Sequence, residues 1–357
     1  MSKPEATLDL SQCATSLADA AALFAEAAHH LSDAVHAMRD ALPPAPPALS
    51  KSPAGVATPI EYESSEDNDA SSCQFASAPG ASAFDRVPSF NRAMHSAHHA
   101  NYPKHTYIVV EEDFDIIPLI AYLADTHDKT VCYISHCQKV TPYRPILKAV
   151  TCRTVIRPAN TKKSMKQQIP IFLHSDSGVL LLGGDHAPPA PLKDALVDGM
   201  ICYGFTSSDQ FHTQINLLRA TRTFLLLTKA EASLLTDGFV SKHGLEPHPE
   251  SAQLTAYGPN SPLLPYRGKT KAVLSKIPPQ YLKSAYLGKL SLTSKSKAET
   301  ARRANEFAAK VLLRGNPEDG SKLYPPIGPR LRLTMQEVSK RALDKAVGQG
   351  LVLLEEV

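Results

Sequence analysis

The chain has 357 residues, of which 43% are hydrophobic, and a formal net charge of only +3. That length holds two ordinary domains or one domain with extensions. No apolar run is long enough to cross a bilayer as a helix, so we expect no membrane association. The six cysteines form no CxxC pair, so a reducing compartment fits better than a disulfide framework. We therefore expect an intracellular protein, cytoplasmic or nuclear, because Glu5 and Asp9 argue against a mitochondrial presequence.

Residues 8–42 predict a helix with a heptad repeat. Large residues recur every seven positions at Leu10, Leu17, Phe24, Leu31 and Met38, and smaller ones at Ala14, Ala21, Ala28, Val35 and Leu42. Alternating steps of four and three place both sets on one seam, which favours self-association into a homo-oligomer. An amphipathic helix that docks on its own domain is the alternative. Residues 43–100, rich in Pro, Ala and Ser with an acidic cluster, predict a disordered linker.

From residue 101 to 240, short apolar runs alternate with helical stretches. The expected strands are 105–111, 130–135, 151–156, 177–182, 199–203 and 222–227, and the expected helices are 115–126, 141–149, 161–172 and 208–219. This alternation predicts an α/β fold with a parallel sheet covered by helices on both faces.

The remaining chain predicts a loop and then a basic helical extension. Residues 241–270 are rich in Pro and Gly and are expected to form the loop. Residues 271–357 follow, with helices at 278–290, 296–313 and 333–347 and an apolar segment at 350–354. Residues 266–345 hold 18 Lys/Arg and 6 Asp/Glu, whereas residues 1–100 hold 5 and 12. Such a basic tail favours contact with a polyanion, although a solvated helical surface would give the same pattern.

Two phrases within residues 104–235 carry a resemblance: the strand-like Ser177–Leu181 and, later in the chain, Phe211–Ile215. The first resembles the strand before the Thr-Asp-x-x-Ala-Arg-Gly motif of DEAD-box RNA helicases, and the second resembles their Tyr-Ile-His-Arg-Ile phrase. In the order of its elements, the whole block resembles the second RecA-like domain of that family. Ala304–Ala308 with Pro325 and Pro326 is similar to the helical extension of fungal mitochondrial DEAD-box helicases. The resemblance implies a single RecA-like sheet, RNA as a partner and, by family, a mitochondrial location as the alternative.

The residues that contact phosphate in the family are largely missing here. Nothing supplies the first domain's phosphate loop or its Asp-Glu-Ala-Asp carboxylates, because Gly268-Lys269-Thr270 lies among prolines with no strand before it. In the aligned phrase the family's arginines fall on Gln214, Leu217 and Ala220. Asp185, Arg219 and Arg222 are the candidate remnants on the nucleotide side. We expect no catalytic residue, no metal site and no cofactor; ATP with magnesium is the alternative if a partner supplies the first domain.

Two sets of basic residues are candidates for nucleic-acid binding. Lys162, Lys163 and Lys166 open a predicted helix, where free amides and lysines together favour phosphate. The tail contributes Lys295, Lys297, Arg302, Arg303, Lys310, Arg330 and Arg332. Lysines that merely solubilise a helix are the alternative interpretation.

The leading hypothesis is a non-catalytic, helicase-derived RNA-binding or scaffold protein. One alternative is an ATP-dependent helicase subunit that acts with a separate first RecA domain. Another is a coiled-coil interaction module with no role in nucleic-acid binding.

Overall fold

The computed structural model describes residues 102–135, 140–159, 161–184, 189–193, 195–291 and 296–355. The predicted heptad helix at 8–42 and the linker at 43–100 lie outside these residues, and both stay predictions. Among the described helices, none is long and apolar enough to cross a membrane.

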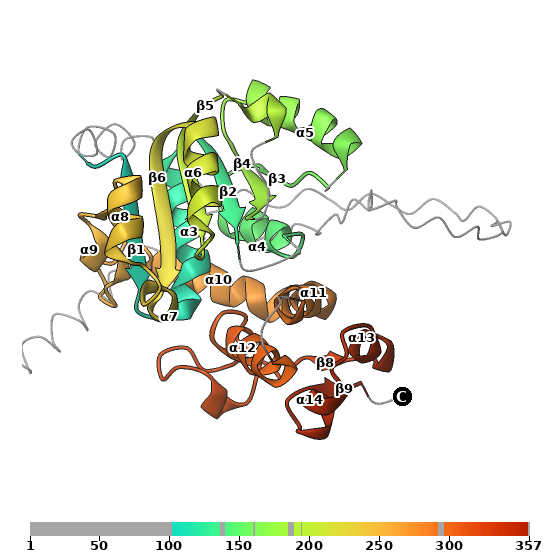
Figure 1. The fold of residues 1–357 in the computed structure, drawn as a ribbon. Helices are drawn as coiled ribbons and strands as arrows, with labels where there is room; N and C mark the ends of the chain where they lie inside the picture. Colours follow the sequence, from blue (N-terminus) through green and yellow to red (C-terminus); the bar gives the residue numbers. More distant parts are fainter. Residues whose placement is uncertain are drawn as a thin grey trace, which may run out of the picture. The chain divides into compact units, whose positions relative to one another are not determined.

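A seven-stranded sheet forms the centre of the fold (Figure 1). Its strands are β1 (His105–Val110), β2 (Lys129–Ile134), β3 (Val155–Ile156), β4 (Gly178–Gly183), β5 (Leu196–Tyr203), β6 (Arg219–Thr228) and β7 (Glu246–Pro247). The order is β3-β4-β2-β5-β6-β1-β7, and every pair is parallel. Each predicted strand overlaps one of these strands and the parallel α/β fold class is confirmed, but the strand predicted at 151–156 is limited to Val155–Ile156, because Thr151 ends the preceding helix. β7 is a short additional edge strand.

Helices follow the strands and cover both faces of this sheet. They are α3 (Ile116–Thr126), α4 (Tyr143–Val150), α5 (Lys162–His174), α6 (Ser208–Leu217), α7 (Lys229–Ala232), α8 (Asp237–His243) and α9 (Ser251–Thr255). Short 3-10 turns occur at η2 (Asp113–Asp115) and η3 (Ala190–Leu192). Since successive strand residues point to opposite faces, the sheet builds two cores.

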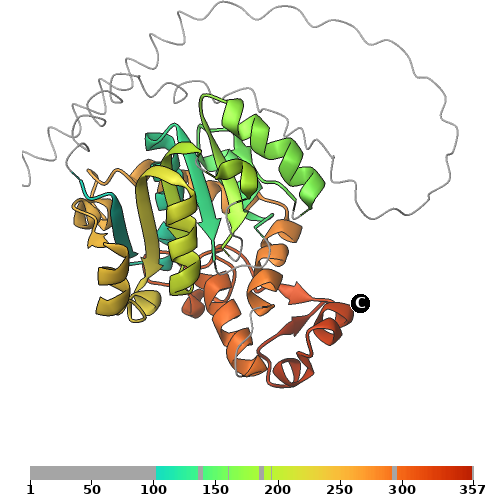
Figure 2. The same ribbon diagram turned by 45° about the horizontal axis from the view of Figure 1, so that its top comes forward.

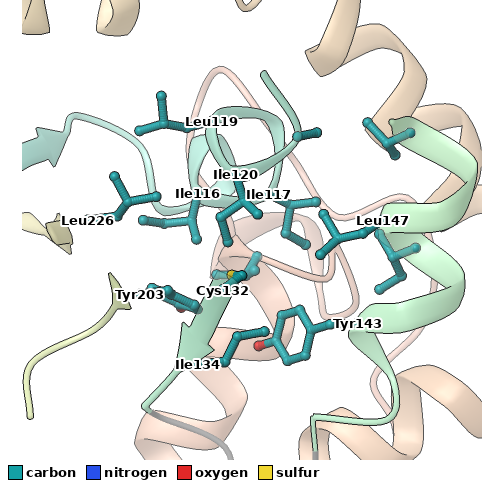
Figure 3. Packing of buried hydrophobic residues seen from close by; sticks show 14 of the residues in the cluster. Ile116, Ile117, Leu119, Ile120, Cys132, Ile134, Tyr143, Leu147, Tyr203 and Leu226 are labelled. Carbon is teal, nitrogen blue, oxygen red and sulfur yellow. The ribbon is translucent and has the colours of Figure 1, made fainter. Parts of the chain in front are cut away.

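The two cores divide the helices between them. Cys132 and Ile134 of β2 pack with α3 and α4, whereas Val131 and Tyr133 pack with α5 and α6. Figure 3 shows Ile116, Ile117 and Ile120 of α3 above Cys132, with Tyr143 of α4 beside them. Both faces of β2 are therefore buried, which explains why its sequence is apolar without alternation.

The C-terminal extension continues from the first of these cores. It contains α10 (Leu264–Lys276), α11 (Pro279–Leu290), α12 (Lys297–Lys310), η4 (Pro317–Asp319), α13 (Met335–Lys340) and α14 (Asp344–Gly348), with a small parallel pair β8 (Arg332–Leu333) and β9 (Leu353–Leu354). The helix predicted at 333–347 is two helices, because Ala342 adopts a left-handed backbone with φ 52°.

The predicted loop at 241–270 is wrong. That segment includes the end of α8, β7, α9 and the first half of α10, and Pro265 is tolerated because it lies in the first turn of α10. Gly268-Lys269-Thr270 is part of that helix, with Thr270 fully buried. This triplet therefore forms no phosphate loop.

Candidate functional site

The carboxyl ends of β2, β4 and β5 meet at one edge of the sheet, where α/β proteins bind ligands. The Ser135 amide donates to the Tyr203 carbonyl at 2.9 Å, and the Gly184 amide donates to the Ile134 carbonyl at 2.9 Å. A Cβ added to Gly184 would lie 2.3 Å from the Ser135 Cα, so only glycine fits there. Residues 136–139 and 185–188, including Asp185, lie outside the described residues.

Two glutamines of α6 point into this edge rather than out of it. Gln214 is fully buried, and its Nε2 donates to the Gly184 carbonyl at 2.8 Å. Gln210 donates to the same carbonyl. Gln214 stands where the helicase phrase has its first arginine. In this chain that position satisfies an internal carbonyl, and it presents no cation to a ligand.

Arg219 and Arg222 lie at the opposite edge of the sheet, which corrects the expectation that they are remnants beside Asp185. Arg222 pairs with Gly199 near the start of β5, whereas Leu226 pairs with Tyr203 at its end. Four residues of strand separate these levels, or about 13 Å at 3.3 Å per residue. Arg222 instead donates to the carbonyls of Tyr102 and Pro103, the latter at 3.2 Å.

The chain's own extension lies against part of the carboxyl edge. Figures 1 and 2 show α11 and α12 on the side to which the strand arrows point. The Phe114 and Tyr324 ring centroids are 4.3 Å apart, and the Lys289 Nζ lies 6.0 Å from the Tyr203 ring centroid. Burial raises the pKa of Asp113 in η2, although Lys310 of α12 opposes the shift. The ends of β1 and β5 are therefore covered by residues that the resemblance did not place there.

Ser208, His243 and Lys242 form a polar cluster at this edge that resembles a nucleophile with a base. The Ser208 Oγ lies 3.0 Å from the His243 Nε2 and accepts from the Lys242 Nζ at 2.9 Å. The buried His243 Nδ1 has no partner. A proton on Nδ1 would be a buried donor without an acceptor, so the tautomer with the proton on Nε2 is favoured. His243 then donates to Ser208 and cannot act as its base.

The lysines of α5 are exposed at the helix start, as predicted. Thr161 caps the helix by accepting from the Ser164 amide at 3.2 Å. Lys162, Lys163 and Lys166 are exposed, and none has an ion pair within the described part of the chain. Since α5 contains no Asp or Glu, its positive charge is not offset along the helix.

Most of the predicted cations on α12 are paired with acids of the same helix. Glu299 accepts from Arg302 at 3.1 Å and from Arg303 at 2.9 Å, and these bonds lower the pKa of its carboxyl. Lys310 pairs with Glu306. Lys297 is exposed in the first turn, and Lys295 lies outside the described residues. The net positive charge on α12 is therefore much smaller than its Lys and Arg content suggested.

Arg330 and Arg332 have different environments. Arg330 is half-buried and its Nη2 donates to the Leu351 carbonyl at 3.0 Å. It therefore links the segment before β8 to the segment before β9. Arg332 is exposed on β8, opposite Leu353. The structure does not bring these two residues together with the lysines of α5 in any contact between described side chains.

Sequence reasoning missed a buried ion pair that fastens α10 to the sheet domain. Arg267 is 5% exposed and donates twice, at 2.8 Å each, to the fully buried Asp115. The Tyr257 hydroxyl donates to the same carboxylate at 2.7 Å, and the guanidinium carbon lies 4.4 Å from the Tyr257 ring centroid. No local pattern marks a pair whose members are 152 residues apart.

Comparisons with known proteins found similarity among solved structures alone. No family model matches the sequence, and no curated protein matches it. Among solved structures, the chain is similar to "Mss116p DEAD-box helicase domain 2 bound to an RNA duplex", with 12% identity, a TM-score of 0.43, and coverage of 71% of this chain and 100% of that one. The similarity of the tail to fungal mitochondrial extensions stays a prediction. By its strand order and its helices on both faces, the parallel sheet fits the RecA-like domain that the sequence resemblance predicted.

Proposed function

We propose that this protein is a non-catalytic, helicase-derived scaffold that binds RNA through its backbone phosphates. The observation that carries this proposal is a set of exposed cations on helices that contain no carboxylate. They are Arg144 and Lys148 on α4, Lys162, Lys163 and Lys166 on α5, and Lys269, Lys271 and Lys276 on α10.

The arrangement at the carboxyl edge supports the non-catalytic part of the proposal. Phosphoryl transfer needs cations and amides fixed around the transferring group. Gln214 is turned inward, Arg219 and Arg222 lie at the far edge, and α11 and α12 lie against the ends of β1 and β5. Within the described residues, no cation of the aligned helicase phrase remains at that edge.

Exposed cations without acidic partners favour phosphate because each one releases counterions when it binds. Contacts of this kind follow the backbone and carry little base specificity. If four or five of the cations, as many as α4 and α10 present on one face of the sheet, each contact one phosphate of a duplex region, the logarithm of affinity falls with the logarithm of salt at a slope of about −3.5 to −4.5.

A filter-binding titration of the full chain with a structured RNA, repeated from 50 to 300 mM salt, tests the proposal. We expect tight binding at low salt and a slope in that range. Absence of RNA affinity at 50 mM salt would reject RNA binding and favour the interaction-module alternative. A parallel phosphate-release assay with ATP and magnesium tests the second part, because RNA-stimulated release would instead support the helicase-subunit alternative.

A further inference from the structure

Two acid-free helices, α4 and α10, pack against each other on the first face of the sheet. Arg144 and Lys148 of α4 are both exposed and lie one turn apart, about 40° around the helix. Lys269 and Lys276 of α10 are exposed and lie two turns apart, about 20° around theirs. We call these four residues the α4–α10 surface.

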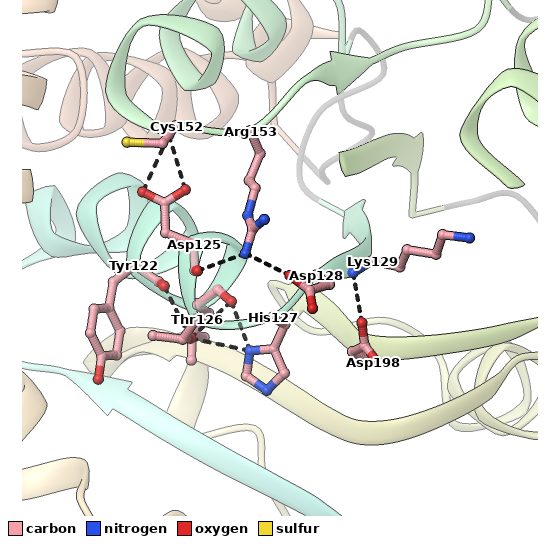
Figure 4. Close-up of polar contacts among 10 residues, drawn as sticks. Tyr122, Asp125, Thr126, His127, Asp128, Lys129, Cys152, Arg153 and Asp198 are labelled. Atoms are coloured by element: carbon pink, nitrogen blue, oxygen red, sulfur yellow. Dashed lines mark hydrogen bonds and ion pairs between the residues drawn. The ribbon is translucent and has the colours of Figure 1, made fainter. Parts of the chain in front are cut away.

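On α10, Lys269 lies close to the C-terminal end of α4. Tyr266, one turn before Lys269 and Thr270, donates its hydroxyl to Asp125 at 3.1 Å. Asp125 also accepts from the Cys152 amide at 3.0 Å, two residues after α4 ends (Figure 4). The Lys269 Nζ lies 6.0 Å from the Tyr266 ring centroid on this same side. The two α10 lysines of this surface, Lys269 and Lys276, therefore begin beside the C-terminal end of α4.

Asp125, the carboxylate that acts electrostatically with Lys269, and the neighbouring Asp128 both have other partners. Arg153 contacts the Asp128 carboxylate at 3.1 Å and the Asp125 carbonyl at 3.0 Å (Figure 4). Burial raises the pKa of Asp125, whose oxygens already accept from Cys152 and Tyr266. Among the described residues, Arg144, Lys148 and Lys276 have no ion pair. Their charge is therefore available to an external anion.

The predicted α12 site differs in this respect. Arg302 and Arg303 share Glu299, so a phosphate there would approach a carboxylate as well as two guanidinium groups. The repulsion from Glu299 offsets part of the attraction. On the basis of this contrast, we infer that RNA contacts the α4–α10 surface through its phosphate backbone, and that α12 contributes little. The inference rests on the proposed function and names the face that performs it.

Two variants of the full chain, matched in charge, test the assignment. The first is Arg144→Gln, Lys148→Gln and Lys276→Gln; the second is Lys297→Gln, Arg302→Gln and Arg303→Gln. Each removes three positive charges from exposed positions. We expect the first variant to make the salt slope shallower by about 2 to 3, at 0.7 to 0.9 per lost contact, and the second to change it by less than about 1.

The controls separate this assignment from the proposed function. If the wild type binds no RNA, the proposed function fails. If the wild type binds and the first variant matches it, or if the second variant loses more than the first, only the surface assignment fails. Polyglutamate and unlabelled RNA are also compared as competitors for labelled RNA bound to the wild type. If polyglutamate competes as strongly as RNA at equal charge concentration, the partner is an acidic protein and the RNA assignment fails. Far-UV circular dichroism checks folding, and Lys148→Gln and Lys276→Gln measured singly replace the triple variant if its spectrum changes.

Discussion

Replacing Arg267 with Met should destabilise the protein strongly, because it leaves a carboxylate buried without its cation. Asp115 is fully buried and receives two hydrogen bonds from Arg267 at 2.8 Å each, and only the Tyr257 hydroxyl would remain. Breaking a buried pair from one side costs about 3–5 kcal/mol. That is a large fraction of the roughly 5–15 kcal/mol of unfolding free energy typical of folded proteins.

Urea denaturation followed by far-UV circular dichroism measures this loss, since the chain has no tryptophan to report by fluorescence. Arg302→Met is the control, because its pair with Glu299 is exposed and should contribute about 0.5 kcal/mol or less. The double variant Asp115→Leu with Arg267→Met should be more stable than Arg267→Met alone, since no buried charge remains. The reasoning would be refuted by an Arg267→Met variant within about 1 kcal/mol of wild type, or by a double variant no better than the single one.

Three further predictions concern the carboxyl edge. Gly184→Ala should destabilise the protein by about 1–3 kcal/mol, because the new methyl group would overlap the Ser135 backbone. Gly238→Ala in the first turn of α8, where a new Cβ meets no atom within 4 Å, should stabilise it by about 0.5 kcal/mol or less. Urea titrations compare the two variants, and equal effects would contradict the geometry. Gln214→Arg should lower the melting temperature without creating RNA-stimulated ATP hydrolysis, since the side chain is fully buried; a stable, active variant in the phosphate-release assay would overturn this. Burial and a neighbouring cation lower the pKa of His243, so the unfolded chain takes up more protons below pH 6.5 and stability falls between pH 7.5 and 5.5. His243→Gln should lose less melting temperature over that interval than the wild type does, and an identical loss would exclude His243 as a contributor.

Local patterns were sufficient for the elements of the sheet domain. Continuous apolar runs predicted β1 to β6, because strands covered on both faces need apolar side chains at every position. The prediction failed at 241–270, where Pro and Gly suggested a loop. Pro265 instead occupies the first turn of α10, and Arg267, Thr270 and Leu274 bury that helix against the sheet domain. Tertiary packing overrode local preference there.

The candidate site shows the same division. The sequence by itself determined the parallel α/β order, the start of α5 with its lysines, and the loss of the helicase arginines at Gln214 and its neighbours. Only the tertiary structure decided that Arg222 lies at the far edge, that Glu299 engages two of the tail's cations, and that α4 and α10, which contain no acid, pack against each other. Charge content is a property of the sequence, whereas the field that a ligand meets depends on which charges the fold brings within a few ångströms of one another.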